Sequence, residues 1–200
     1  MSTPAEYLKK LQEYIHAMKF TLFISLLFVS VNLSGQNLDS LRNAVRSDAR
    51  WSIIQNDFCK GEKLLDSLML LEPNNSKNYF EKAMIYYFQI KEDSLLINLN
   101  RSLSLGMDSL TVLNQIYDFY TFQKNDNAKR IETVNSMINN NPNNSELYIK
   151  RSGVWTVLRN FDESWKDLEH AASLGNENAK IILQEIILTR KKLQEKGIIK

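Results

Sequence analysis

The sequence predicts an all-α fold, an α-solenoid in which pairs of helices joined by short turns repeat along the chain. The first observation is an internal echo, because Pro-Asn-Asn-Ser occurs at residues 73–76 and again at 142–145, so that Pro73 and Pro142 lie 69 residues apart. Similarity at a fixed spacing indicates a repeat architecture, and 69 is about twice a 34-residue helix-turn-helix unit. The second is composition: 6 Gly and 3 Pro in 200 residues favour long helices over many short strands.

The echo extends well beyond these four residues. A shift of 69 residues carries Tyr79 onto Tyr148, Lys82 onto Arg151, Tyr86 onto Trp155, Asp93 onto Asp162 and Leu99 onto Leu168. We interpret Pro-Asn-Asn-Ser as the joint between units. The proline ends one helix, the asparagines form the turn, and the hydroxyl of Ser76 or Ser145 caps the next helix.

These signals divide the chain into four expected units over residues 42–178, at about 42–75, 76–109, 110–144 and 145–178. One extra residue in the turn near Lys124 would explain a spacing of 69 instead of 68. Residues 179–200 are expected to form a capping helix and a tail, because solenoids need a polar outer end. The expected packing face of that helix consists of Ile181, Ile182, Ile186, Ile187 and Leu193.

Residues 18–35 are typical of an export signal. Lys19 is followed by an apolar run over residues 20–33 and then by small and polar residues. The run is short for a membrane span, which needs about 20 apolar residues, but it fits the apolar core of a signal peptide. We expect export to the periplasm or cell envelope, with an uncleaved membrane anchor as the alternative. Residues 1–17 have a doubtful status, because they would make an unusually long start to a signal peptide and Met18 could be the first residue.

Two segments, residues 76–106 and 145–175, resemble the tetratricopeptide repeat. The resemblance rests on large residues at Tyr79 and Tyr148, aromatic ones at Tyr86 and Trp155, and small ones such as Ala83, Ser152, Ser164 and Ala171. Small residues let paired helices approach while the aromatic rings fill the gaps between them. The resemblance implies a right-handed α-solenoid whose first helices line a concave face, which in this family usually holds a peptide or partner segment.

The family's groove positions fall on fourteen residues of this chain. They are Lys77, Phe80, Met84, Tyr87 and Phe88 in the second unit; Thr111, Asn114, Asp118, Thr121 and Phe122 in the third; and Glu146, Ile149, Thr156 and Val157 in the fourth. Phe80, Met84, Tyr87 and Phe88 would form an apolar binding patch if exposed, and burial against neighbouring units is the alternative. The Lys and Asn set with which some family members clamp a carboxylate is absent, so an apolar or mixed segment is the expected ligand.

The sequence carries few signs of chemistry. Without residues 1–35 the chain has 22 basic and 21 acidic side chains, because three of the 25 basic and two of the 23 acidic residues lie there; this balance argues against a nucleic-acid partner. No phosphate loop or metal-ligand spacing occurs. His170 is the only histidine outside that leader and is expected at the surface, and Cys59, the only cysteine, is expected to pack inside the protein, with pairing to another molecule as the alternative. We therefore expect no enzyme activity, cofactor or metal.

Asp-Ser-Leu occurs four times and resembles an O-glycosylation pattern that some bacteria use on exported proteins. The candidate acceptors are Ser40, Ser94 and Ser109, which are expected near helix starts, whereas Ser67 is expected in mid-helix. The structural alternative is that Asp and Ser start helices while Leu packs inward.

Together these features predict a non-catalytic scaffold or adaptor that binds a segment of another protein on the concave face. The alternative is a membrane-anchored structural or envelope-assembly component in which the array serves as a spacer. A membrane contact is expected only if the N-terminal apolar segment stays uncleaved.

Overall fold

The computed structural model describes residues 35–196, which are helical apart from short turns and contain no strand. The all-α prediction is therefore confirmed for these residues. The expected leader lies outside them, except for Gly35. The chain divides into two compact units, residues 1–47 and 48–200. In the first unit the described residues form the beginning of α2 (Gly35–Ile54), where Arg42 forms an ion pair with Asp39 at 3.0 Å.

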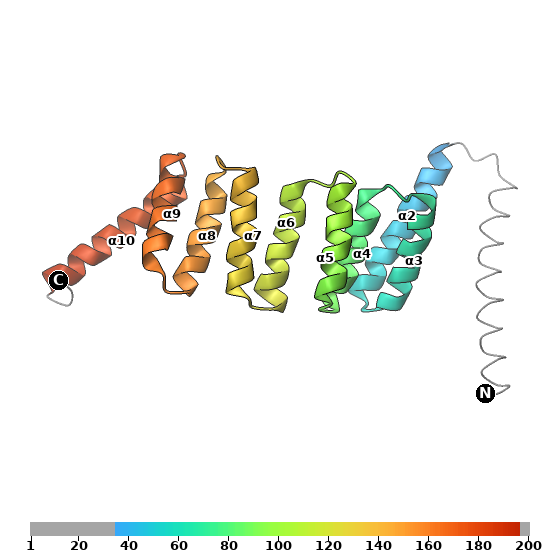
Figure 1. Cartoon of the computed structure of the whole chain (residues 1–200), viewed down its shortest axis with the longest axis horizontal. Coiled ribbons are helices and arrows are strands. Elements are labelled where there is room, and N and C mark those ends of the chain that lie inside the picture. The colour runs from blue at the N-terminus through green and yellow to red at the C-terminus, as the bar shows by residue number, and fades with distance from the viewer. Residues whose placement is uncertain (1–34, 197–200) are drawn as a thin grey trace, which may run out of the picture. The chain divides into compact units, whose positions relative to one another are not determined.

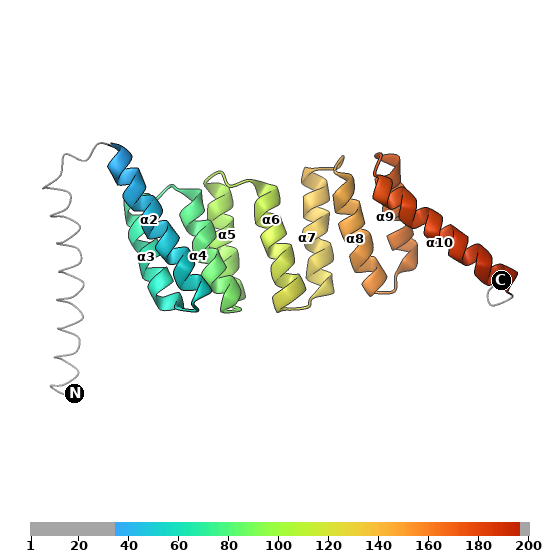
Figure 2. The ribbon, with the colours of Figure 1, turned by 180° about the vertical axis from the view of Figure 1, so that it is seen from behind.

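The second unit consists of successive helices packed side by side in chain order (Figures 1 and 2). After the end of α2 come α3 (Phe58–Leu71), α4 (Ser76–Phe88), α5 (Glu92–Ser104), α6 (Ser109–Asp118), the π-helix η1 (Phe119–Gln123), α7 (Asn127–Asn140), α8 (Ser145–Val157), α9 (Phe161–Ser173) and α10 (Glu177–Glu195). The turns alternate between two edges. The turns at residues 55–57, 89–91, 124–126 and 158–160 lie along one edge, the lower one in Figure 1, which we call the turn edge; the joints at 72–75, 105–108, 141–144 and 174–176 form the joint edge.

The predicted period is visible in the backbone of the turn edge. Each of its four turns holds one non-glycine residue in the left-handed conformation: Asn56, Ile90, Asn125 and Arg159, with φ between 51° and 59°. These residues follow one another at intervals of 34, 35 and 34. Two successive intervals therefore always give 69, which is the spacing of the sequence echo.

The extra residue predicted near Lys124 is accommodated in a helix, and the interpretation as a longer turn is wrong. The turn at 124–126 has three residues, like the turns at 89–91 and 158–160. The additional length lies in η1, where the Lys124 N–H donates to the Phe119 carbonyl at 3.2 Å across five residues. A π-helical turn takes up extra residues without ending the helix.

The two Pro-Asn-Asn-Ser joints have the same construction. Glu72 and Asn141, which precede the prolines, end α3 and α7 with φ of −133° and −140°, because a residue before proline is excluded from the α conformation. The Tyr79 and Tyr148 hydroxyls then donate to the carbonyls of Pro73 and Pro142, at 3.0 and 2.9 Å. The predicted serine caps are wrong.

The residues that cap α4 and α8 are Asn75 and Asn144. Their side chains accept hydrogen bonds from the Lys77 and Glu146 N–H groups at 3.1 and 3.2 Å. Ser76 and Ser145 are the first residues inside these helices. Either residue type is a good helix cap, so the pattern Asn-Ser did not by itself distinguish them.

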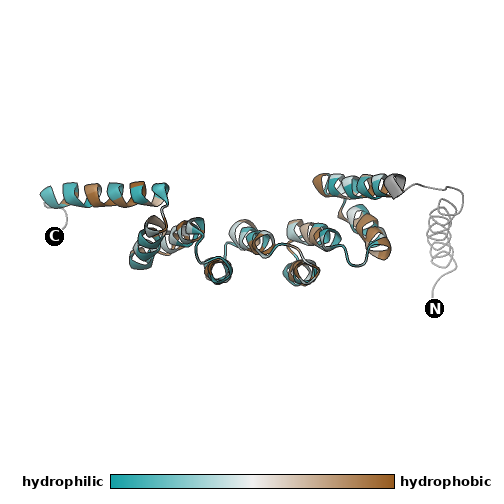
Figure 3. Cartoon of the chain, turned by 90° about the horizontal axis from the view of Figure 1, so that it is seen from above, coloured by the Kyte–Doolittle hydropathy of each residue, from teal (hydrophilic) through white to brown (hydrophobic). Residues whose placement is uncertain are grey.

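The core of the second unit is shared between neighbouring helices. One buried cluster joins α4, α5, α6 and η1 and contains Ala83, Tyr87, Leu95, Leu99, Val112, Phe119 and Tyr120. A second joins α6 to α10 and includes Tyr117, Val134, Met137, Tyr148, Val154 and Leu168. Viewed from above and coloured by hydropathy, the helices carry both hydrophilic and hydrophobic stretches (Figure 3). No single helix pair can bury such a surface alone.

The predicted capping helix exists as α10, but much of its expected packing face is exposed. Only Ala179 is fully buried in this helix, and Ile182 and Leu183 pack partly buried against the core. Ile181, Ile186 and Ile187, which were expected to pack, are exposed. The capping helix therefore leaves apolar surface uncovered by the residues that the structure describes.

Candidate partner-binding surface

Four apolar side chains at equivalent positions lie exposed along the turn edge. They close the first helix of each pair: Ile54 ends α2, Phe88 ends α4, Phe122 lies in the last turn of η1, and Val157 ends α8. Their exposed fractions are 68%, 53%, 72% and 61%. We call these residues the apolar row. Large exposed apolar side chains that gather on one surface mark binding sites in soluble proteins.

Three members of the row, Phe88, Phe122 and Val157, are predicted contact residues, whereas sequence reasoning missed Ile54. The signal that could have found it is the period itself, because the row positions follow one another at intervals of 34, 34 and 35. Further exposed apolar side chains accompany the row along the turn edge: Trp51, Ile90, Leu158 and Phe161.

The joint edge has a different character. Its exposed residues include Pro73, Asn74, Asn139, Asn140 and Asn143. The exposed apolar residues near the joints, Leu70, Leu71 and Leu103, do not recur, since a shift of 69 residues replaces them by asparagine or alanine. Only the turn edge carries an apolar position that repeats with the helix pairs.

The apolar patch expected from Phe80, Met84, Tyr87 and Phe88 is not formed. Tyr87 is buried, with its ring centroid 5.8 Å from that of Phe119 in an edge-to-face arrangement. Phe80 and Met84 are partly buried and pack against the same core. Because η1 brings Phe119 under Tyr87, only Phe88 of this group remains exposed.

A half-buried polar cluster lies on the same first helices, between α6 and α8. Lys150 of α8 donates to the Asn114 side-chain oxygen of α6 at 2.8 Å, and its ammonium lies 4.5 Å from the ring centre of Tyr117. Burial lowers the pKa of Lys150, and the negative charge of Asp118 partly opposes this shift. Burial likewise raises the pKa of Asp118, opposed by Lys150.

The predicted residues Asn114 and Asp118 therefore meet in this cluster, together with Lys150, which sequence reasoning missed. The opposed effects on the two pKa values leave a paired cation and anion, and no nucleophile and base are brought into contact. We interpret the cluster as a polar link between two first helices.

The remaining predicted contacts are held by neighbours within the array. Thr111 donates to Asp108 with both its N–H and its hydroxyl, at 2.8 Å each. Glu146 accepts from the Asn176 side chain at 2.7 Å, and the Thr156 and Ser164 hydroxyls lie 2.9 Å apart. Thr121 donates to the Tyr117 carbonyl, and Ile149 packs against the core. Lys77 is exposed at the start of α4.

The side chains considered for catalysis do not converge. His170 is exposed on α9, as expected, with its ring centroid 4.2 Å from that of Tyr148. Cys59 is exposed on α3, so the expectation that it packs inside the protein is wrong. Across residues 35–196, no three His, Cys, Asp or Glu side chains are grouped as metal ligands. Within that same range no helix has the length and apolar character that a membrane span needs.

The Asp-Ser-Leu copies occupy different structural positions. Asp108 is the N-cap of α6 and Ser109 its first residue, and Ser94 is partly buried in the first turn of α5. Ser40 lies inside α2, so its expected position at a helix start is wrong. Ser67 is in mid-helix, as expected, where its hydroxyl donates to the Lys63 carbonyl at 2.9 Å. The copy at 108–110 thus has a structural role as a helix cap.

Several solved structures have a similar arrangement of helices. A MamA protein has 16% identity over 78% of this chain and 91% of its own, with a TM-score of 0.48. PilW, a widely conserved type IV pilus biogenesis factor, has 15% identity over 66% of this chain and 61% of its own, with a TM-score of 0.47. YrrB, described as a TPR protein with an unusual peptide-binding site, has 8% identity over 70% of this chain and 90% of its own, with a TM-score of 0.37.

No protein-family model matches the chain. No curated protein matches it significantly. The low identities to the solved structures transfer neither a partner nor a process to this chain, and the assignment of the fold rests on its own helices.

Proposed function

We propose that the chain is a non-catalytic scaffold that binds an apolar or mixed segment of another protein along the apolar row. The observation that carries this proposal is the recurrence of an exposed apolar side chain at the end of each first helix, at Ile54, Phe88, Phe122 and Val157. One such side chain would be unremarkable in a soluble protein. A set repeated in register offers a partner several contacts in a line.

The energetics favour such a segment. Burying one large apolar side chain contributes about 1.5–3 kcal/mol, so a partner that covers three or four members of the row can offset the cost of ordering its own chain. The turns hold the row positions in place, since each lies within a few residues of a fixed left-handed residue. This pre-organisation reduces the entropy that binding costs.

A comparative cross-linking capture tests the proposal. The full chain is compared with a Phe88→Ser, Phe122→Ser double variant and with a Leu70→Ser control, because Leu70 is 85% exposed on α3 but lies outside the row. We expect one protein to be captured by the wild type and the control and lost with the double variant, whose folding is checked by circular dichroism. Identical capture by all three would refute the row as the site and favour the spacer alternative.

We further propose that the scaffold works outside the cytoplasm, in the periplasm or cell envelope. The pattern of residues 18–35 supports this proposal. The test is the N-terminal sequence and mass of the protein from its native host after cell fractionation. Cleavage near residue 35 with the protein in the soluble envelope fraction is expected; an intact N-terminus in the membrane fraction would support the anchored alternative, and an intact chain in the cytoplasm would contradict export.

A further inference from the structure

Helix α10 carries apolar side chains on two separate sides. One side packs on the core through Ala179, Ile182 and Leu183. Ile181 and Leu188 lie on another side and are 52% and 57% exposed. At 3.6 residues per turn, this second pair is roughly 160° around the helix from the centre of the packed side. A helix that is apolar on two sides is typically covered on both.

The exposed side has a symmetric sequence pattern. Glu177, Ile181, Leu188 and Lys192 are separated by 4, 7 and 4 residues, and all four lie within an arc of about 60°. We call these four residues the outer face of α10. Reversing the direction of the helix places the acid where the base was and exchanges the two apolar residues. The outer face is therefore complementary to itself in an antiparallel arrangement.

We propose that the outer face of α10 binds the outer face of a second copy of this chain, with the two helices antiparallel about a twofold axis. Ile181 then contacts Leu188 of the second copy, and Glu177 pairs with Lys192 of the second copy; symmetry repeats both contacts. Gln184 and Glu185 lie nearest the axis. A twofold interface of this kind uses one surface twice and closes at two copies.

The charge distribution selects the antiparallel direction. The first half of α10 carries two acidic and one basic side chain, Glu177, Glu185 and Lys180, whereas the second half carries four basic and one acidic, namely Arg190, Lys191, Lys192, Lys196 and Glu195. Parallel helices would place the two strongly basic halves side by side. Antiparallel helices place each basic half beside an acidic half, and such complementarity fixes the register of an interface.

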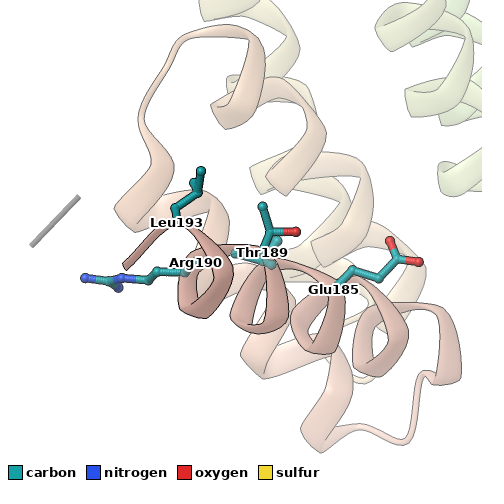
Figure 4. A pocket seen from close by; sticks show the side chains of 5 residues that line it. Glu185, Thr189, Arg190 and Leu193 are labelled. Carbon is teal, nitrogen blue, oxygen red and sulfur yellow. The ribbon is translucent and has the colours of Figure 1, made fainter. Parts of the chain in front are cut away.

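Two hollows elsewhere on α10 are separate from this face. A pocket of about 380 Å³ is lined by Glu185, Ile186, Thr189, Arg190 and Leu193 (Figure 4). A groove of about 840 Å³ lies between α9 and α10, with Phe161, Trp165, Ile186 and Ile187 as its apolar lining. Neither contains a member of the outer face. The proposed dimer therefore leaves both open, and it also leaves the apolar row accessible.

The interface is small, so the expected dimer is weak and its population depends on concentration. Sedimentation analysis of the full chain over a wide concentration range measures it. We expect Glu177→Lys and Lys192→Glu each to weaken self-association by about tenfold or more, since each creates two repulsive contacts per dimer. Arg190→Glu, a charge reversal on the same helix but outside the outer face, is the matched control and should have a much smaller effect.

Mixing the two defective variants gives the decisive measurement. A dimer of one Glu177→Lys chain and one Lys192→Glu chain has two attractive pairs, so the mixture should associate about as well as the wild type. A mixture that stays as weak as its components would overturn the proposal, as would a wild-type chain that remains monomeric throughout. This comparison does not depend on the stability of either variant alone, since both are present in the control samples.

Cysteine cross-linking tests the direction of the helices. In a Cys59→Ser background, Gln184→Cys lies near the twofold axis and should form a disulfide with its own copy, whereas Glu177→Cys should not. The reverse result would exclude the antiparallel arrangement.

Discussion

Ile90 is the residue whose side chain fits its backbone least well. Its φ is 58°, in a turn where the equivalent positions hold Asn56, Asn125 and Arg159. The left-handed conformation costs an ordinary L-residue about 1–2 kcal/mol, and β-branched side chains fare worst there, whereas asparagine tolerates it. Because Ile90 is 48% exposed, replacing it loses little apolar burial.

We expect Ile90→Asn to raise the free energy of unfolding by about 1 kcal/mol. Urea denaturation of the variant and the wild type measures the change. Arg159→Asn serves as the comparison and should gain less, because arginine is not β-branched. A loss of stability in Ile90→Asn would show that the isoleucine contributes more through packing than its backbone conformation costs.

Arg151 holds a buried carboxylate in place. Its guanidinium donates to both oxygens of Asp167, at 2.9 and 2.6 Å, and to the Asn135 oxygen at 2.6 Å. The Asp167 hydrogen bond raises the pKa of Arg151, opposed by burial. Asp167 is 4% exposed, so removing its partner leaves a buried charge without compensation.

We expect Arg151→Ala to lower the free energy of unfolding by about 3–5 kcal/mol. The control is Lys82→Ala, at the equivalent position of the earlier repeat, where the partner Asp66 is exposed and the expected loss is below about 1 kcal/mol. Thermal or urea unfolding compares the two variants. Equal losses would mean that burial of the carboxylate does not decide the effect.

Tyr86 makes stability depend on alkaline pH. Burial, followed by the hydrogen bond with Glu62, raises its pKa to about 12 from the usual value near 10. A raised pKa means that the folded chain holds the phenol proton more tightly, so this contribution is fully present below pH 10 and is lost as the pH rises toward 12. Tyr86→Phe should therefore show a smaller loss of stability between pH 10 and 12 than the wild type. The urea midpoint as a function of pH measures this, and parallel curves would contradict it.

At the scale of the element, the joints explain why the helices begin where they do. Asn75 accepts from the Lys77 N–H and donates to Glu72 at 2.9 Å, so one side chain caps α4 and ties it to the end of α3. We expect Asn75→Ala to cost about 1 kcal/mol and Ser76→Ala only a few tenths. Unfolding free energies of the two variants decide between the caps. A larger effect of Ser76→Ala would restore the interpretation in which the serine is the cap.

The elements also show how far sequence reasoning reaches. The helix pairs, the joints at Pro73 and Pro142 and the capping helix were predictable, because proline, turn residues and the spacing of apolar residues act locally. The π-helix was not, since its only trace is one residue too many in the count. Its consequence at Tyr87 was equally hidden, because burial of that ring depends on Phe119, which lies 32 residues further along the chain.

The candidate site was predictable in part for the same reason. Phe88, Phe122 and Val157 come from positions that the repeat pattern marks, and Ile54 follows from the period once it is established. Lys150 was missed because nothing in its own segment distinguishes a lysine that turns toward Asn114 and Tyr117 of the preceding first helix. Contacts between repeats depend on the pairing of two helices, which composition and spacing do not specify.

At the scale of the whole array, each described helix of the second unit gains its stability from its neighbours. The buried clusters pass from α4 through η1 and from α6 to α10 without belonging to any one pair. In such an array stability is approximately a sum of terms between adjacent units. The helices between two neighbours should then be held from both sides, and α10, with only Ala179 fully buried, from one.

Native-state hydrogen exchange tests this gradient and the proposed dimer together. We expect the slowest exchange in α4, α5, α7 and α8, and the fastest, among these helices and α10, in the second half of α10, because local opening needs least free energy where fewest contacts are broken. Raising the protein concentration should slow exchange in α10 selectively if its outer face pairs with a second copy. Protection of α10 that equals that of α8 at the lowest concentration would contradict the gradient. Protection that does not change with concentration, in a sample that sedimentation shows to be dimeric, would place the contact between copies on another face.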